Sequence, residues 1–110
     1  MKYSDAQRMD KIRDTTPKLL DYLKCENISR EQVLSDETLR WTITMPLYNI
    51  GEHVYNLSDE FKAATPGIPW VKISGLRHRL VHDYENTNWT IINSIIFDVL
   101  PGFYEDIKGL

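Results

Sequence analysis

A segment in the last third of the chain combines three side chains that suit chemistry on phosphate groups. The run from Arg77 to Tyr84 reads RHRLVHDY, so that His82 follows the arginine by five positions and Tyr84 by seven. A guanidinium is a permanent cation whose planar fork can bind two oxygens of one phosphate, and an imidazole exchanges a proton near neutral pH. Arg77, His82 and Tyr84 are therefore the main candidate site residues.

An uninterrupted helix would keep Arg77 and His82 apart. At about 100° per residue, side chains five positions apart point about 140° from one another, whereas Arg77 and Tyr84 nearly superimpose. Joint action on one phosphate requires that the helix unwinds near His82 or that a partner surface wraps around it. The polar run 85–88 favours a helix end there. Side chains on opposite, unconnected faces would contradict joint action.

Three further side chains around this run are candidates for contacting RNA or assisting the reaction, namely Lys72, His78 and Arg79. The net charge of −3 argues against indiscriminate nucleic-acid binding, which depends on basic side chains that displace counterions from phosphates. Any contact with RNA should therefore be local. A solvated helix face of mixed charge explains Lys72 and Arg79 equally well.

Each main candidate also has a purely structural alternative. Arg77 could pair with Glu52 or another carboxylate between helices, and His82 could be a helix C-terminal histidine stabilised by the local dipole. Tyr84 could lie at the edge of the core. A metal site is not expected, because His78 and His82 have no third ligand beyond His53 or Asp83 and no zincin-type glutamate. We predict no metal and no cofactor.

The composition indicates one ordinary globular domain spanning residues 1–110. Hydrophobic residues make up 42% of the chain and charged residues 26%, which is typical of a folded protein without low-complexity tracts. Cys25 is the single cysteine, so an intrachain disulfide is excluded and a reducing compartment is favoured. No signal peptide is apparent, and polar residues interrupt the longest apolar run, 91–100. We expect a cytoplasmic protein with no membrane contact.

Apolar spacing predicts helices throughout. Ser4, with Gln7 reaching back in a capping box, should start a first helix that runs to about Lys24 and is bent or restarted by Pro17. A connection with at most one short turn follows. Ser35 is the expected N-cap of a long second helix.

The second helix carries a regular apolar stripe that must face other helices. Pro46 within it should cause a kink. Trp41, Tyr48 and Tyr55 recur every seven residues beside the stripe and indicate either an aromatic dimer contact or core packing. The stripe consists of Leu39, Ile43, Leu47, Ile50, Val54, Leu57 and Phe61.

The rest of the chain predicts two further helices and a last turn. A proline-rich corner, residues 64–70, should end the second helix, and a third helix should start near Trp70. A fourth is expected from Trp89 to about Leu100, where Pro101 with Gly102 ends or redirects it. The predicted fold is all-α, an up-and-down bundle of four to five helices.

The chain resembles the HepT-like branch of the HEPN superfamily. Arg77, His82 and Tyr84 match its R-x4-H-x-Y motif, and the resemblance extends from about Asp5 to the C-terminus. Four other segments agree with the family pattern. One position departs from it, because His78 stands where the family has asparagine or another small polar residue, and it either assists as a second acid or base or marks an altered site. The four segments are Ile50-Gly51-Glu52, Pro66-Gly67-Ile68-Pro69-Trp70, Leu80-Val81 and Leu100-Pro101.

The resemblance implies a HEPN-like fold and a homodimeric toxin of a toxin-antitoxin pair. Such a protein is a metal-independent endoribonuclease whose cleft lies where two copies of the motif meet. Arg77 would hold the scissile phosphate, and His82 would be the general acid or base. Tyr84 would accept adenylyl groups from a nucleotidyltransferase antitoxin of the MntA-like kind, which would block the site.

A second class of function also fits these residues. A noncatalytic HEPN module could bind a nucleotide or dock the transferase, with Arg77 and His82 serving only as an anion site. The acidic net charge and His78 favour this module. The intact set of Arg77, His82 and Tyr84 favours the ribonuclease.

Overall fold

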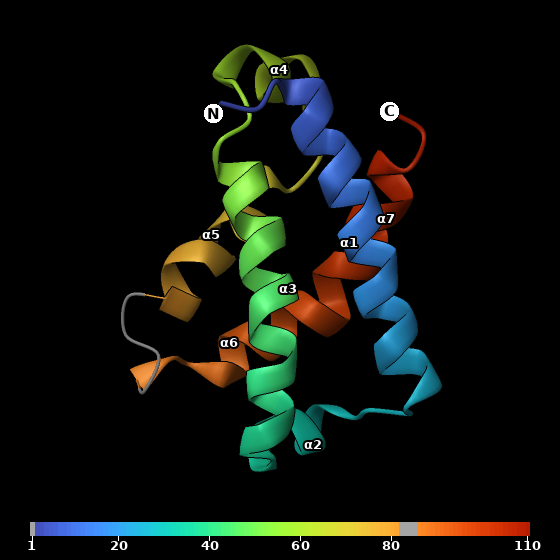
Figure 1. Cartoon of the computed structure of the whole chain (residues 1–110), viewed down its shortest axis with the longest axis vertical. Coiled ribbons are helices and arrows are strands. Elements are labelled where there is room, and N and C mark those ends of the chain that lie inside the picture. Colours follow the sequence, from blue (N-terminus) through green and yellow to red (C-terminus); the bar gives the residue numbers. More distant parts are fainter. Residues whose placement is uncertain (1, 82–85) are drawn as a thin grey trace.

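A computed structural model of the protein describes residues 2–81 and 86–110 (Figure 1). These residues contain no strand, which confirms the predicted all-α class. The elements in chain order are α1 (Asp5–Cys25), α2 (Arg30–Ser35), α3 (Glu37–Tyr55), α4 (Asp59–Ala64), α5 (Trp70–Val81), α6 (Trp89–Ser94), the π-helical turn η2 (Ile95–Val99) and α7 (Leu100–Ile107).

The long helices pack around α3. In Figure 1, α1 and α3 lie side by side, α5 packs against α3, and the stretch from α6 to α7 crosses behind α3 toward α1. One apolar core connects the long helices, because α1, α3 and α5 each have buried positions at intervals of three or four residues. Its fully buried side chains include Ile12, Ile43, Leu47, Ile50, Ile73, Leu76, Ile92, Ile96, Phe103 and Ile107.

The helix starts follow local capping rules, with one correction. The predicted capping box of Ser4 and Gln7 is present at α1, and Asn88 caps α6 by accepting from two backbone N–H groups. The prediction of Ser35 as the cap of the second long helix was wrong. Ser35 is the last residue of α2, and the carboxylate of Asp36 caps α3 by accepting from the Leu39 N–H at 3.1 Å.

Neither internal proline interrupts its helix. α1 continues through Pro17, so of the two predicted effects, a bend or a restart, the restart does not occur, and α3 likewise continues through Pro46. A proline removes one backbone donor, and the long buried face on either side of each proline keeps the helix intact. Ile12 and Leu19 flank Pro17 in the core.

The second long helix is shorter than predicted. α3 ends at Tyr55, and the last two stripe positions, Leu57 and Phe61, belong to the following link and to α4. A distant contact stabilises this break, since the Asp5 carboxylate accepts from the Ser58 N–H at 2.9 Å and from its hydroxyl at 2.6 Å. Leu57 is nevertheless buried, so the stripe continues across the break.

Of the two predicted effects of Pro101 with Gly102, to end or to redirect the helix, the first does not occur. Pro101 and Gly102 do not end the helix, because Pro101 lies at the start of α7, where a missing N–H is tolerated. Directly before α7, the hydrogen bonding changes from α-helical to π-helical in η2, where the Leu100 N–H donates to the carbonyl of Ile95. No helix among the described residues is long and apolar enough to span a bilayer.

Candidate active site

A glycine lets α3 and α5 approach closely at the candidate site. A β-carbon built on Gly51 would lie 2.7 Å from the backbone nitrogen of Arg77 and 3.1 Å from the β-carbon of Leu76. Only a residue without a side chain fits this crossing. The residue after this glycine is Glu52, so the crossing brings its carboxylate to the arginine of the motif.

Arg77 donates from Nε to Oε2 of Glu52 at 2.5 Å. Its guanidinium carbon also lies 4.3 Å from the centre of the Tyr55 ring, in a cation-π contact. The side chains of Arg77 and Glu52 remain 33% and 31% exposed, so solvent reaches the pair. The pairing with Glu52 that the sequence allowed is therefore present, and it coexists with an accessible guanidinium.

Charge stabilises both partners of this pair. Partial burial raises the pKa of Glu52, but hydrogen bonds from Arg77 and Tyr48 and the Arg77 charge outweigh it, so the pKa lies below its usual range. The amide of Asn56 donates to Oε1 of Glu52 at 3.0 Å, which occupies the second carboxylate oxygen. The hydrogen bond to Glu52 raises the pKa of Arg77.

The geometry leaves the tip of the arginine fork for an anion. The hydrogen bond to Glu52 uses Nε, and no other described residue forms a hydrogen bond with Nη1 or Nη2 of Arg77. Glu52 and Tyr55 thus restrict the guanidinium from two sides while both terminal nitrogens stay usable. A guanidinium held in this way loses less freedom when it binds a phosphate.

Two of the three main candidates lie outside the described residues. These are His82 and Tyr84, which follow the end of α5. The requirement that Arg77 and His82 converge on one phosphate therefore stays a prediction. The described part of the chain holds no group of three or more histidine, cysteine, aspartate or glutamate side chains arranged for a metal ion.

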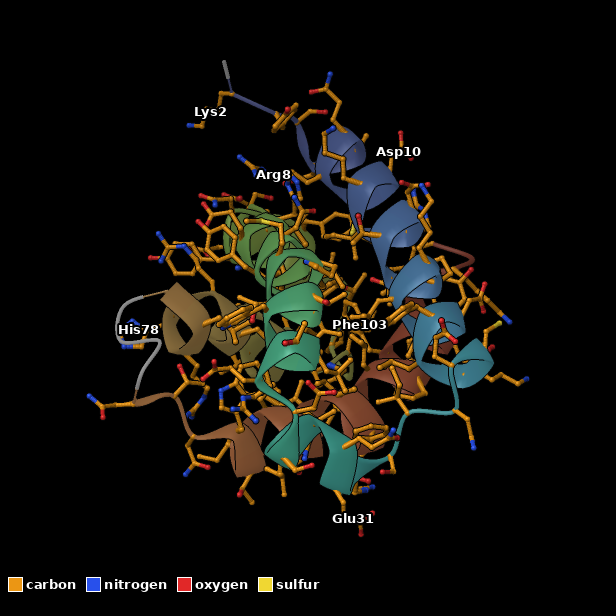
Figure 2. The ribbon with its side chains drawn as sticks, turned by 60° about the horizontal axis from the view of Figure 1, so that its bottom comes forward. Lys2, Arg8, Asp10, Glu31, His78 and Phe103 are labelled. Atoms are coloured by element: carbon orange, nitrogen blue, oxygen red, sulfur yellow. The ribbon has the colours of Figure 1, made fainter. Side chains whose placement is uncertain are left out.

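The three secondary candidates do not share the face of Arg77. Lys72 and Arg79 are exposed and line a groove between α5 and the α6–η2 stretch, whereas Arg77 faces α3. His78 is exposed at the edge of the molecule (Figure 2). Only Arg77 among the described basic residues of the motif helix is therefore placed beside Glu52.

Sequence reasoning missed the environment of His53. It was weighed only as a metal ligand, yet it is 93% buried and its Nδ1 accepts a hydrogen bond from Nη1 of Arg8 at 3.2 Å. The edge of the Tyr3 ring packs against it, with 5.7 Å between ring centres. Burial lowers the pKa of His53, and the charges of Arg8 and Lys11 lower it further. The 45 positions between Arg8 and His53 leave no local sequence signal.

Comparison with known proteins agrees with these features. The family model described as Ribonuclease HepT-like matches residues 6–110. A protein of Caldanaerobacter subterraneus named "Putative RNase TTE0752" is 33% identical over 79% of this chain and 78% of its own length. A protein of Thermococcus cleftensis named "Probable ribonuclease HepT" is 24% identical over 98% of this chain and 99% of its own length.

No solved structure matches the chain significantly. The family match covers nearly the whole chain, including both helices that form the Gly51 crossing and the complete R-x4-H-x-Y motif. The all-α architecture agrees with the HEPN-like fold. This chain therefore belongs to the HepT-like ribonuclease family.

Proposed function

We propose that this protein is a metal-independent endoribonuclease and the toxin of a toxin-antitoxin pair. The proposal rests mainly on the hydrogen bonding of Arg77. Its Nε donates to Glu52, whereas its two terminal nitrogens have no hydrogen-bond partner among the described residues. Arginine–carboxylate pairs are frequently bidentate, whereas the described bond to Glu52 uses only Nε and leaves the terminal nitrogens able to bind an anion. The family membership supports a ribonuclease in general.

The proposed reaction uses the 2′-hydroxyl of RNA as the nucleophile. His82 removes the 2′ proton or protonates the departing 5′-oxygen, while the 2′-oxygen bonds to phosphorus and the bond to the 5′-oxygen breaks. The products are a 2′,3′-cyclic phosphate and a free 5′-hydroxyl. A histidine suits this proton transfer, which typically contributes about 10²- to 10⁴-fold in rate.

Arg77 stabilises the charge that grows on the phosphorane. Its two terminal nitrogens match two phosphate oxygens, an arrangement that a lysine cannot reproduce. Glu52 and Tyr55 position the guanidinium before RNA arrives, so that little reorganisation is needed in the transition state. Glu52 thus acts through Arg77 and is a positioning residue.

A second copy of the chain fits the exposed face of α3. Trp41, Met45 and Tyr55 are 58%, 68% and 54% exposed, and with half-buried Tyr48 and Glu52 they follow the four-three spacing of a helix-packing seam. Exposed aromatic and methionine side chains are typical of interface cores. Because Arg77 stacks on Tyr55, a twofold axis that passes near Tyr55 would bring two motif arginines together.

Tyr84 is the proposed site of regulation. A nucleotidyltransferase antitoxin would transfer an adenylyl group from ATP to its phenolic oxygen and release pyrophosphate. The added phosphate would compete with RNA for the guanidinium of Arg77 and repel the backbone of the substrate. Mass spectrometry after incubation with such a transferase and ATP should detect added AMP on the wild type and none on Tyr84→Phe, and an equal gain in mass on Tyr84→Phe would refute the assignment.

A noncatalytic module is the second candidate. The observation that favours it is the same ion pair, because the charge of Arg77 is partly neutralised by Glu52. Such a protein would bind nucleotides at Arg77 without cutting RNA. Cleavage by the purified protein separates the two candidates.

The deciding assay follows a labelled RNA with wild type, Arg77→Ala and His82→Ala in the presence of a metal chelator. The ribonuclease proposal predicts cleavage by the wild type and a loss of about 10²-fold or more in each variant. Cleavage that survives both substitutions, or that requires an added divalent metal, would overturn the mechanism. Nucleotide binding without cleavage would establish the second candidate.

A further inference from the structure

A groove of about 450 Å³ runs between α5 and the α6–η2 stretch, away from the candidate active site. Arg79 lines it, and because Arg79 lies two positions after Arg77 it projects about 200° further around α5. The groove therefore lies on a different face of α5 from the ion pair of Arg77 with Glu52. Nothing in the proposed ribonuclease mechanism uses it.

The floor of this groove is aliphatic and open to solvent. Val71, Ile91, Ile95 and Val99 contribute apolar surface, and Val71 and Ile91 are 85% and 36% exposed. An exposed apolar patch of this kind is a frequent mark of a docking surface. Aromatic side chains, on which the bases of single-stranded RNA stack, are absent from its described lining.

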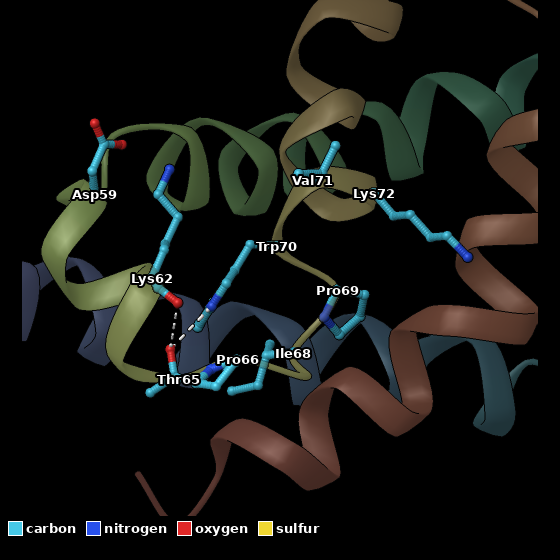
Figure 3. Close-up of a pocket in the computed structure, with 9 residues that line it drawn as sticks. All are labelled: Asp59, Lys62, Thr65, Pro66, Ile68, Pro69, Trp70, Val71 and Lys72. Carbon is cyan, nitrogen blue, oxygen red and sulfur yellow. Dashed lines mark hydrogen bonds between the residues drawn. The ribbon is translucent and has the colours of Figure 1, made fainter.

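The rim of the groove is positively charged. Lys72 and Arg79 line it, and no described aspartate or glutamate does. Several other basic side chains are paired with a carboxylate, as Arg30 is with Asp98. Neither Lys72 nor Arg79 forms an ion pair with a described residue. In Figure 3, Lys72 extends from α5 toward the α6–α7 stretch. In a chain of net charge −3, this is a local excess of positive charge.

A glycine keeps the groove open at its centre. Gly75 lies between Lys72 and Arg79 in the interior of α5, and a β-carbon built there would meet nothing within 4 Å. A glycine inside a helix is less favourable than alanine. Unlike Gly51, this glycine has no packing reason, and a larger side chain would fill the groove.

We propose that this groove docks an acidic amphipathic helix of a partner protein. A third helix fits between two helices, with its apolar face on the aliphatic floor. Lys72 and Arg79 are seven residues apart, or about 10.5 Å along α5, so they match carboxylates two turns apart on the incoming helix. Two copies of this chain, joined symmetrically through the groove, would place like charges against each other.

The test uses isotope-labelled protein and three defined probes, observed by nuclear magnetic resonance. The first probe is a capped 14-residue helical peptide with leucines on one face and glutamates seven positions apart. The second peptide has lysine at each glutamate position. The third is a short 2′-O-methylated RNA, which this chemistry cannot cleave. We expect only the acidic peptide to shift resonances of α5 and α6, with a dissociation constant of about 1 mM or tighter.

Variants then locate the binding. Lys72→Glu with Arg79→Glu should weaken the acidic peptide at least tenfold, and Gly75→Leu should do the same by filling the floor. Gly75→Ala is the matched control, because its methyl group has room, and it should bind as the wild type does. Each variant's folding is checked by its thermal unfolding.

Several results would overturn the proposal. Equal binding of both peptides, or no resonance shift with the acidic peptide at about 1 mM, would exclude an acidic helix as the partner. Preferential binding of the RNA in the groove would assign the groove to nucleic acid. Resonance changes in the groove when the protein alone is diluted would identify a second copy as the occupant. The outcome does not depend on whether the protein cleaves RNA. Failure here would leave the ribonuclease proposal untouched.

Discussion

Gly51 and the backbone nitrogen of Arg77 lie so close that a β-carbon on Gly51 would come within 2.7 Å of that nitrogen. This crossing of α3 and α5 holds Glu52 and Arg77 together, because the carboxylate is carried by the next residue along α3. Packing of two helices thus determines where the guanidinium of the candidate site is held.

Gly51→Ala should therefore destabilise the protein. The added methyl group meets backbone atoms that cannot move like the end of a flexible side chain, and overpacking of this kind costs about 1–3 kcal/mol. Denaturant unfolding measures the change. Gly75→Ala is the control within α5, and it should be neutral or raise stability by about 0.5–1 kcal/mol. Similar stability of the two variants would show that the crossing is less tight than described.

His53 should make stability depend on pH just below neutrality. Burial and the charges of Arg8 and Lys11 lower its pKa from the usual 6.5, so the unfolded chain binds the proton more readily than the folded one. The free energy of unfolding should fall as pH falls from about 6.5 to the lowered pKa, and this contribution should be complete above 6.5. Below the lowered pKa, both states are protonated and the slope disappears.

His53→Asn provides the comparison. The asparagine oxygen can accept from Arg8 in place of Nδ1 but does not titrate. The free energy of unfolding, measured between about pH 5 and 7, where histidines titrate, should show a weaker slope with pH in the variant. The same slope in both proteins would assign the pH dependence to another group. Losses of stability below about pH 4 belong to the carboxyls whose pKa is lowered in the folded state, namely Asp5, Glu52 and Asp98.

Met45→Arg should convert the proposed homodimer to a monomer. Met45 is 68% exposed, so the change removes little from the core of one chain, but it would bury a charge if the α3 seam faces a second copy. Light scattering after size-exclusion chromatography measures the mass. Leu34→Arg is the control, because Leu34 is 47% exposed on α2 and lies off the seam. A dimer that persists in Met45→Arg would exclude this seam.

The parts of the fold that depend on local rules could be predicted from the sequence. The Ser4 cap, the apolar stripe of α3 and the buried edge of α5 follow from capping chemistry and helical spacing. The end of α3 could not be predicted from the sequence, since the contact of Asp5 with Ser58 joins residues 53 positions apart. Ser35 and Asp36 are both good N-cap residue types, so residue type alone does not show which of these neighbours caps α3.

The candidate site, too, could be predicted from the sequence only in part. The motif identified Arg77, and residue types suggested Glu52 as a partner, but only the helix crossing shows that Gly51 permits the contact. The separation of Arg79 from Arg77 follows from helical geometry and was available from spacing. The sequence does not show which element each face of α5 meets, because that depends on how α5 packs against α3 and leaves a groove toward α6.

The central claim is that Glu52 serves catalysis by holding Arg77. A double-mutant cycle of single-turnover RNA cleavage, with Arg77→Ala, Glu52→Gln and the double variant, tests it most directly. Glu52→Gln alone should slow cleavage about tenfold, equivalent to about 1.4 kcal/mol of transition-state stabilisation, with RNA affinity changed far less. The double variant should be no slower than Arg77→Ala. Independent losses that multiply in the double variant, or a wild-type rate in Arg77→Ala, would contradict the account.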